Sequence, residues 1–239
     1  MIIKYDEHYS ADYWTGRKQY IDANGRTQLY HGPALDWTGF DLVCGALTPL
    51  LPGKTLLDIG CGGGALAGRF LQKGYDAYGV DVSEYAIANC IPEMKGHLAV
   101  RDITIAPLLT AEWPATFDVV MATDLLEHLY FEDLDRTFDW MLKMANKWLF
   151  FLVAIQDDPK AEEFIHTKGD PIPPKFEGVA VSGHVHVRHP DWWIRYFKLK
   201  GLRIDWHRMY VFQSIRAKNA SWQATGGWGF GNTFILEKR

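Results

Sequence analysis

The stretch over residues 56–64 limits the possible folds of this chain more than any other. Its sequence, Leu-Leu-Asp-Ile-Gly-Cys-Gly-Gly-Gly, passes from a short apolar run straight into a cluster of glycines. An apolar run that ends in glycines predicts a buried strand followed by a tight turn. Because glycine accepts positive φ angles and has no side chain, a ligand can approach the backbone of such a turn closely.

A helix is expected directly after the turn, over residues 65–73, where Leu66, Phe70 and Leu71 recur at helical spacing. The first N–H groups of a helix have no partner within it and lie at the positive end of its dipole. A strand, a glycine turn and a helix in this order are typical of a nucleotide or nucleoside site at the carboxyl end of the strand.

Strands and helices alternate along much of the chain. Apolar runs predict strands over residues 55–59, 76–81, 98–100, 117–122 and 148–155. Helical spacing predicts helices over residues 84–90, 134–146 and 190–200. Such alternation implies an α/β fold with a mostly parallel sheet and helices on both of its faces. Two more strands, over 202–208 and 230–237 with an aromatic-rich connection, predict an antiparallel pair at the sheet edge.

Two segments depart from this regular pattern. Residues 1–40 are rich in aromatic side chains and lack periodicity, so we expect an N-terminal cap on a main domain over residues 41–239. Tyr13, Trp14 and Tyr20 in this cap either cover a ligand or pack in the core. Residues 156–183 contain four prolines and mixed charge, which predicts a long loop that acts as a lid.

Composition limits the function classes. A net charge of −4 and an isoelectric point near 6.1 argue against a general nucleic-acid binder. Three cysteines at wide spacing, Cys44, Cys61 and Cys90, form neither a disulfide framework nor a metal pair. We expect a reduced, cytoplasmic protein without a membrane segment, since no apolar leader follows Met1 and no apolar run reaches about 18 residues.

Carboxylates at the ends of three successive predicted strands indicate the charge of the ligand. Asp81 ends the second strand about 20 residues after the turn, where a ribose would lie, and Asp102 follows the third, where it can accept a hydrogen bond from an adenine amine. Asp58 lies inside the first strand, where it would oppose a pyrophosphate and favour an ammonium group. Three such carboxylates favour S-adenosylmethionine, which carries an ammonium and a sulfonium, over NAD.

The same segments resemble the motifs of class I methyltransferases. Residues 57–64 resemble their first motif, residues 79–83 their second-strand motif, and residues 117–128 the fourth strand and following turn of small-molecule methyltransferases; residues 184–193 resemble a segment that follows the lid in related bacterial enzymes. The resemblance covers about residues 50–205. It implies a Rossmann-like seven-stranded sheet whose last strand is antiparallel, with S-adenosylmethionine as the cofactor. The predicted cofactor-binding residues are Asp58, Gly60, Cys61, Gly62, Asp81, Val82, Asp102, Ile103, Thr123 and Asp124.

The turn after the fourth strand is the expected place of methyl transfer. Transfer is an in-line displacement, so the acceptor must be held close to the sulfonium and must lose its proton to a base. His128 can serve as that base near neutral pH. We predict Glu127, His128 and His184 as catalytic residues; the alternative is that the Glu127–His128 pair only packs locally.

Two alternatives remain open at this stage. Asp124, Glu127 and His128 resemble the Glu-x-x-Glu-His pattern of metal-dependent O-methyltransferases, with His184 or His186 as a further ligand, but Asp stands in place of the first Glu. The other alternative is a non-catalytic protein that binds S-adenosylmethionine.

The favoured acceptor is a small molecule, a sugar or a secondary metabolite, which would be methylated on a hydroxyl oxygen. The remaining histidines are expected to be surface residues or local hydrogen bonders: His8, His31, His97, His166 and His207.

Overall fold

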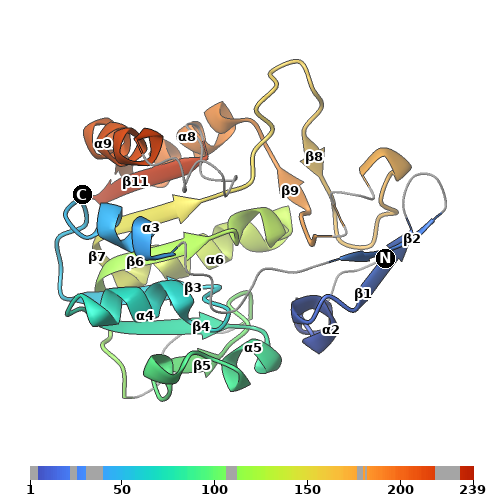
Figure 1. The fold of residues 1–239 in the computed structure, drawn as a ribbon. Coiled ribbons are helices and arrows are strands. Elements are labelled where there is room, and N and C mark those ends of the chain that lie inside the picture. The colour runs from blue at the N-terminus through green and yellow to red at the C-terminus, as the bar shows by residue number, and fades with distance from the viewer. Residues whose placement is uncertain are drawn as a thin grey trace.

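A seven-stranded sheet forms the centre of the protein (Figure 1). The computed structural model describes residues 5–21, 26–30, 40–105, 112–176, 180, 182–218 and 232–239. The strand order across the sheet is β10–β11–β7–β6–β3–β4–β5. The bounds are β3 Thr55–Ile59, β4 Asp76–Asp81, β5 Leu98–Val100, β6 Phe117–Thr123, β7 Ala145–Leu152, β10 Leu202–Ile204 and β11 Thr233–Lys238.

The pairing confirms the predicted fold class. Strands β5, β4, β3, β6 and β7 pair in parallel, so their carboxyl ends meet at one edge of the sheet. The last strand, β11, is antiparallel to β7 and to β10. The expected antiparallel pair at the sheet edge is therefore present.

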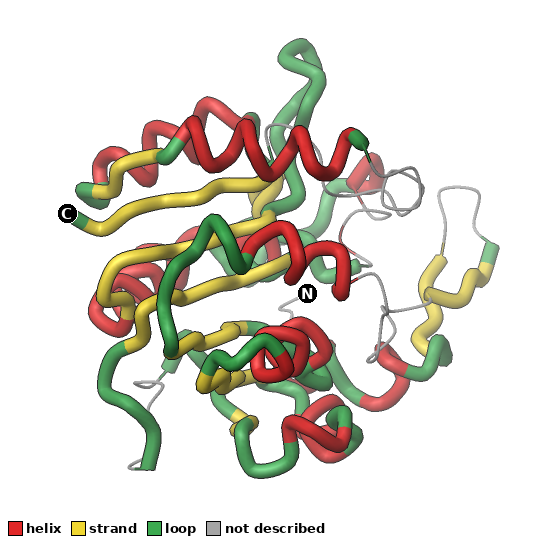
Figure 2. The backbone as a smooth tube through the Cα atoms, turned by 60° about the vertical axis from the view of Figure 1, so that its left-hand side comes forward, coloured by secondary structure: helices red, strands yellow, loops and turns green. Residues whose placement is uncertain are grey.

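Helices cover both faces of the sheet, as predicted (Figures 1 and 2). Neighbouring side chains of β7 point to opposite faces. Phe150 packs against Phe212 of α9, whereas Phe151 packs against Phe138 of α6 and Phe197 of α8. All five of these phenylalanine side chains are buried in the hydrophobic core. The helical bounds are α3 Phe40–Leu47, α4 Ala65–Gln72, α5 Glu84–Ala88, α6 Phe131–Met144, α8 Pro190–Leu199 and α9 Trp206–Ala217.

The remaining elements lie beyond the carboxyl ends of the parallel strands, on the right in Figure 1. They include two short N-terminal helices and a hairpin, α1 Tyr5–His8, α2 Ala11–Trp14, β1 Lys18–Ile21 and β2 Thr27–Tyr30. They also include β8 Phe164–Ile165, which pairs with β9 His186–Val187, and the 3-10 helices η2 Leu126–His128 and η3 Pro174–Phe176. A further 3-10 helix, η1 Pro92–Met94, precedes β5 and contacts α4. No helix in the described ranges is long and apolar enough to cross a membrane.

Several predicted boundaries need correction. The helix predicted over 134–146 is α6, which ends at Met144, and β7 begins at the next residue because Ala145 pairs with Phe117. The strand predicted over 202–208 ends at Ile204. Asp205 then caps α9, since its side chain accepts a hydrogen bond from the Arg208 N–H at 3.0 Å.

A twelve-residue helix thus follows where the end of that strand and the aromatic-rich connection were expected. Residues 219–231, including the first two residues of the last predicted strand, lie outside the described part of the chain. The predicted lid is largely loop, but it contributes β8 and η3. Parts of the predicted cap, residues 1–4, 22–25 and 31–39 with His31, also lie outside the described residues.

Candidate active site

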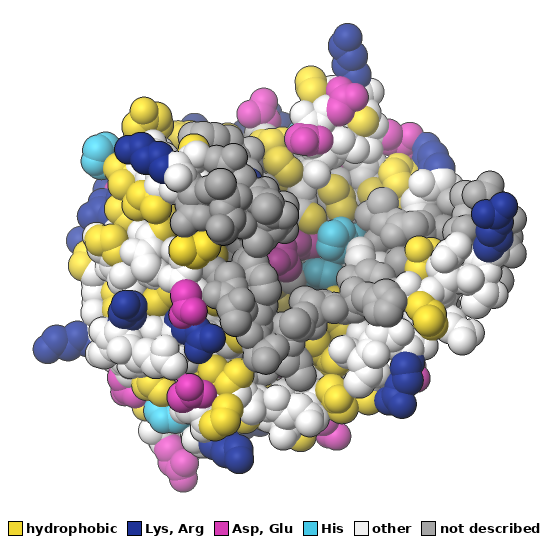
Figure 3. Space-filling model, viewed as in Figure 1, with side chains coloured by type: hydrophobic (Ala, Val, Ile, Leu, Met, Phe, Trp, Pro, Cys, Tyr) yellow, Lys and Arg dark blue, Asp and Glu magenta, His cyan; other side chains and the backbone are white. Residues whose placement is uncertain are grey.

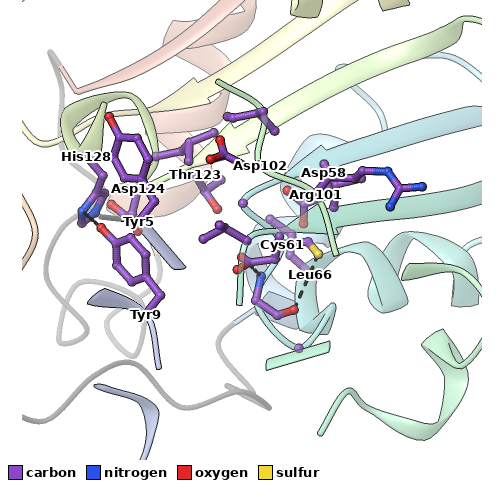
Figure 4. A pocket seen from close by; sticks show the side chains of 18 of the residues that line it. Tyr5, Tyr9, Asp58, Cys61, Leu66, Arg101, Asp102, Thr123, Asp124 and His128 are labelled. Carbon is purple, nitrogen blue, oxygen red and sulfur yellow. Dashed lines mark hydrogen bonds between the residues drawn. The ribbon is translucent and has the colours of Figure 1, made fainter. Parts of the chain in front are cut away.

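A cavity of about 180 Å³ opens at the carboxyl ends of β3, β4, β5 and β6 (Figure 4). Its lining comes from the glycine turn, the strand ends, η2 and the N-terminal helices. Acidic and histidine side chains gather in a hollow between the sheet and the N-terminal elements (Figure 3). Every residue predicted to contact the cofactor lines this cavity: Asp58, Gly60, Cys61, Gly62, Asp81, Val82, Asp102, Ile103, Thr123 and Asp124.

The glycine turn holds the backbone in a conformation that other residues rarely adopt. Gly60, Gly62 and Gly64 have φ angles of 76°, 53° and 77°, in the left-handed region where a side chain would clash with its own backbone. A Cβ atom on Gly60 would also lie 3.0 Å from a methyl group of Leu125. The glycines are therefore required by the path of the turn, which carries the backbone along the cavity wall.

Asp81 joins the second strand to this turn. Its two carboxylate oxygens accept hydrogen bonds from the N–H groups of Gly62 and Ser83, each at 2.8 Å. Burial raises the pKa of Asp81, while these two backbone donors oppose that rise. The carboxylate thus fixes the turn relative to β4 and also faces the cavity.

Asp58 is a buried carboxyl group with an unused oxygen. It is 2% exposed, and its Oδ1 atom has no hydrogen-bond partner among the described residues. Burial, and then the nearby charge of Asp81, raise its pKa to about 7. A cationic ligand in the cavity would reverse both effects, because it favours the ionised carboxylate.

The residues that follow β5 contribute a carboxyl group and an apolar side chain to the cavity wall. Asp102 Oδ1 accepts hydrogen bonds from the N–H and hydroxyl of Thr104, at 2.8 and 2.7 Å. Ile103 is buried beside it and faces the cavity. An apolar side chain next to an anchored carboxylate suits a flat ring that carries an amine.

The end of the fourth strand is strained. Asp124 has a φ angle of 51°, the one positive value of a non-glycine residue in the described chain. Such a conformation costs of order 1–3 kcal/mol and clusters at functional sites. Partial loss of hydration inside the cavity raises the pKa of Asp124 to about 6, although its side chain still reaches solvent. The strained turn aims this carboxyl group and Thr123 into the cavity (Figure 4).

Glu127 lies behind the cavity wall. It is fully buried, its Oε1 atom accepts a hydrogen bond from the Ala154 N–H at 2.8 Å, and its Oε2 atom has no partner among the described residues. Burial and the neighbouring Asp124 raise its pKa well above the usual range. Burial therefore favours the protonated carboxyl, and a cation within reach would favour the ionised form.

His128 lines the cavity beside His184. Their rings are 4.7 Å apart, and His128 Nδ1 lies 2.7 Å from the Tyr9 hydroxyl oxygen. Burial, then the nearby His184 and His8, lower the pKa of His128 well below 6.5; burial lowers that of His184 to about 4. Both rings are therefore neutral at neutral pH, whereas an unshifted His128 was expected from the sequence.

Glu127, His128 and His184 together meet the spacing of a metal site. One ligand atom from each lies within 4.8 Å of the other two. Asp124, which the sequence pattern placed in this set, is not a member of the cluster. The geometry thus brings together the three predicted catalytic residues and leaves Asp124 on the cavity side.

The N-terminal helices contribute residues that sequence reasoning missed. Tyr5 and Tyr9 line the cavity with Tyr13 and Trp14, whereas Tyr20 is not among its lining residues. His8, expected to be unrelated to the site, lies close enough to His128 to lower its pKa. These side chains arrive from a segment without periodicity, so no local pattern marked them.

His186 has a different environment from His184, although the two alternate in the sequence. It is fully buried, and its Nε2 atom accepts a hydrogen bond from Arg188 Nε at 2.9 Å. Its ring packs on Trp192 and Trp193 of α8. His184 precedes β9 and lies beside His128, whereas His186 begins β9 and contacts α8, so the two histidines do not share one environment.

Comparison with known proteins defines the family. A family model described as a methyltransferase domain matches residues 39–206, more than half of the chain. The chain therefore belongs to this family of methyltransferase domains, which confirms the resemblance seen in its motifs.

Relatives of known name fit this assignment. The chain is 40% identical over 118 residues to a ubiquinone biosynthesis O-methyltransferase of Pseudomonas paraeruginosa, which covers 48% of this chain and 50% of the relative. An Azoarcus protein of the same name is 39% identical over 97 residues, 40% of this chain and 39% of the relative. The chain thus spans about half the length, or less, of the curated relatives it matches.

Solved structures share the fold at low sequence identity. Magnesium protoporphyrin IX methyltransferase from Synechocystis, with bound S-adenosylhomocysteine, superposes with a TM-score of 0.51 and 18% identity, over 84% of this chain and 82% of that chain. This similarity supports the α/β methyltransferase architecture.

Proposed function

We propose that this protein transfers a methyl group from S-adenosylmethionine to a hydroxyl oxygen of a small molecule. One observation carries the proposal: a cavity at the glycine turn is lined by carboxyl groups, and buried Asp58 has an unused oxygen there. A cation satisfies such a group and an anion does not. The family assignment and the O-methyltransferase relatives support this proposal.

The lining residues divide between parts of the cofactor. Asp58 and the glycine turn would hold the methionyl ammonium, and Asp81 would bind the ribose hydroxyls. Asp102 and Ile103 would receive the adenine, while Asp124 and Thr123 would lie near the sulfonium. S-adenosylmethionine supplies an electrophilic methyl group when it is bound. The turn N–H groups and carboxylates orient this group toward the acceptor side, where His128 lies.

The acceptor side consists of neutral imidazoles. His128 lines the cavity and would take the proton of the acceptor hydroxyl as its oxygen attacks the methyl carbon. The N-terminal cap and the segment 156–183 would cover this side and exclude water. A sugar or a secondary metabolite remains the predicted acceptor. The protein is still predicted to be cytoplasmic and to bind no nucleic acid.

Binding of the cofactor tests the proposal directly. Calorimetry should detect S-adenosylmethionine and S-adenosylhomocysteine but not NAD. Replacing Asp81 by Ala removes a charged hydrogen-bond acceptor and should weaken binding roughly tenfold or more. Asp76→Ala, at the exposed far end of the same strand, should leave the dissociation constant unchanged. Binding of NAD alone, or equal affinity of Asp81→Ala and wild type, contradicts the assignment.

A metal-assisted transfer is a second candidate, favoured by the cluster of Glu127, His128 and His184. The unpartnered Oε2 atom of buried Glu127 would be satisfied by a divalent ion. Such an ion would bind the acceptor oxygen and promote loss of its proton.

One variant, assayed with and without a chelator, distinguishes the two candidates. The assay needs an acceptor, which a screen of phenols and sugars can identify by the formation of S-adenosylhomocysteine. If His128 is a general base, His128→Ala should lower turnover by about 10²–10⁴-fold and leave cofactor affinity nearly intact. If the cluster holds a metal, a chelator should abolish wild-type turnover and a divalent ion should restore it. If His128→Ala keeps normal turnover but unfolds at a lower temperature, His128 has a structural role only.

A further inference from the structure

A chain of hydrogen bonds runs from the glycine turn to His128. It begins at Asp81, which accepts hydrogen bonds from the N–H groups of both Gly62 and Ser83 at 2.8 Å. The hydroxyl of Ser83 donates to the carbonyl oxygen of Tyr9 at 2.5 Å, and the Tyr9 hydroxyl lies 2.7 Å from His128 Nδ1. Tyr9 and His128 are 119 residues apart in the sequence. The cofactor side and the acceptor side are thus joined by contacts through one N-terminal residue.

Ser83 is a well-fixed anchor for the N-terminal segment. It is buried, it caps α5 by accepting a hydrogen bond from the Ala86 N–H, and it also accepts one from the Trp14 indole at 2.8 Å. Trp14 donates to the Tyr9 carbonyl as well, at 3.1 Å. Both ends of the short segment from Tyr9 to Trp14 are therefore held at the same point, directly beyond the end of β4.

Tyr9 presents its hydroxyl to His128 in a well-packed site. The two rings meet edge to face at 5.7 Å, and Tyr9 packs in the same manner on Tyr13 at 5.0 Å. Burial raises the pKa of Tyr9 well above 10, so the phenol keeps its proton. A neutral phenol can donate to, or accept from, the facing ring nitrogen.

The segment before β9 closes the other side of the same ring. Gly183 has a φ angle of 92°, and a Cβ atom there would lie 2.5 Å from the Tyr9 hydroxyl and 2.9 Å from His128 Nδ1. The Gly183 backbone is also a hydrogen-bond partner of His128 that raises its pKa, as a carbonyl acceptor does. Nδ1 of His128 is therefore enclosed by the N-terminal segment and by Gly183.

We propose that Tyr9 is a positioning residue, which Ser83 ties to the cofactor turn and which holds the His128 ring with its Nε2 atom free for the acceptor. This inference rests on the proposed function. Groups that engage Nδ1 fix both the orientation and the tautomer of an imidazole, which decide whether Nε2 can accept a proton. Tyr9 thereby connects the alignment of His128 to the residues that fix the cofactor turn.

Tyr9→Phe tests the proposal, because it removes only the hydroxyl. Long-range ¹H–¹⁵N spectra of histidine-labelled protein, with S-adenosylhomocysteine bound, should show one dominant His128 tautomer in wild type and a mixture in Tyr9→Phe. Cofactor affinity by calorimetry should change less than about threefold. Turnover of an acceptor found by screening should fall about 10–100-fold at nearly constant KM, as expected for lost orientation.

Three further variants separate positioning from general loosening. Tyr5→Phe cuts the bonds of the same segment to Asp133 and the Tyr130 N–H but does not touch His128, so the His128 spectrum should stay as in wild type. Ser83→Ala should abolish the response of the His128 signals to S-adenosylhomocysteine. If Tyr9→Phe folds poorly, Gly183→Ala provides a second test. Its added methyl group would lie 2.5 Å from the Tyr9 hydroxyl and 2.9 Å from His128 Nδ1, so it should also give a mixture of His128 tautomers.

The outcomes are distinct for the two proposals. Failure of S-adenosylhomocysteine to bind wild-type protein contradicts the proposed function itself. Binding with an unchanged His128 spectrum in both Tyr9→Phe and Gly183→Ala overturns the role of Tyr9. A normal spectral response in Ser83→Ala overturns the link to the cofactor turn.

Discussion

The protein environment makes ionisation unfavourable for three carboxyl groups in and behind the cavity wall. Asp58, Asp124 and Glu127 all have raised pKa values, and burial is the first cause in each case. A protein retains such groups when they act on a ligand, since a hydrophobic residue would cost less. The raised pKa values of these carboxyl groups therefore support the proposal that a cation binds in the cavity.

The proposed role of Asp58 predicts that cofactor binding depends on pH. Its pKa is raised to about 7, so the free protein holds it protonated below that pH. An ammonium group binds the ionised form, and affinity should therefore rise as pH rises from 6 to 7.5, roughly tenfold per unit below the pKa. Calorimetry of wild type and Asp58→Asn measures this, because titration of the ligand itself is common to both.

The Asn variant should bind more weakly at pH 7.5 and show a flatter pH profile than wild type. Identical profiles would mean that Asp58 does not face the ammonium. The stability effect has the opposite sign: since the folded-state pKa exceeds the unfolded value, ionisation of Asp58 costs stability as pH rises from about 4 to 7. Asp58→Asn should remove that cost in the absence of ligand.

At the scale of elements, one buried carboxylate connects three segments. Asp133 at the start of α6 is 3% exposed and accepts a hydrogen bond from Tyr5 of α1 at 3.1 Å. It also pairs with Lys168, in the segment predicted as a lid, at 2.6 Å and with Arg136 at 3.1 Å. The N-terminal segment and the lid segment are thus fixed to one another through α6.

Asp133→Asn should loosen both segments together. Loss of the charge weakens the ion pair with Lys168 and the hydrogen bond from Tyr5, so amide exchange in residues 5–14 and 164–170 should accelerate by about tenfold, or ~1.4 kcal/mol of local opening. Hydrogen exchange with mass spectrometry measures it. Asp139→Asn, whose partner Lys200 directly follows α8, is the matched control and should leave both segments unchanged. Acceleration in only one segment would show that they open independently.

At the scale of the whole molecule, an aromatic layer joins the sheet to two helices. Phe197 of α8 is fully buried and packs against Phe138 of α6, Phe151 of β7 and Phe234 of β11 at 5.1–5.6 Å between ring centres. None of these rings lines the cavity. Stability and binding therefore draw on separate parts of the molecule.

Phe197→Ala should lower the free energy of unfolding by about 3–5 kcal/mol, because it removes a large side chain and leaves a cavity. Denaturant titration measures the change. Leu199 of the same helix is 87% exposed, so the free energy of unfolding of Leu199→Ala should stay within about 0.5 kcal/mol of wild type. Affinity for S-adenosylhomocysteine should be the same in folded Phe197→Ala as in wild type, and a large loss would show that the two parts are coupled.

The sequence by itself determined the sheet and the cofactor side of the site. The alternation of strands and helices implies parallel pairing, and parallel pairing brings the ends of successive strands to one edge. Asp58, Asp81, Asp102 and Asp124 could therefore be placed around the glycine turn from their positions in the chain alone, and all four line the cavity. Local patterns sufficed because each of these residues lies within two positions of the carboxyl end of its own strand.

The tertiary structure alone decided the acceptor side. Tyr9, His8 and Gly183 meet His128 from segments that lack periodicity, and the contact from Tyr9 to His128 spans 119 residues. The divergence of His184 and His186 was equally hidden, since packing on Trp192 and Trp193 sets it. Contacts between segments far apart in the chain leave no repeating signal in the sequence, because they depend on how the packed elements bring irregular segments together.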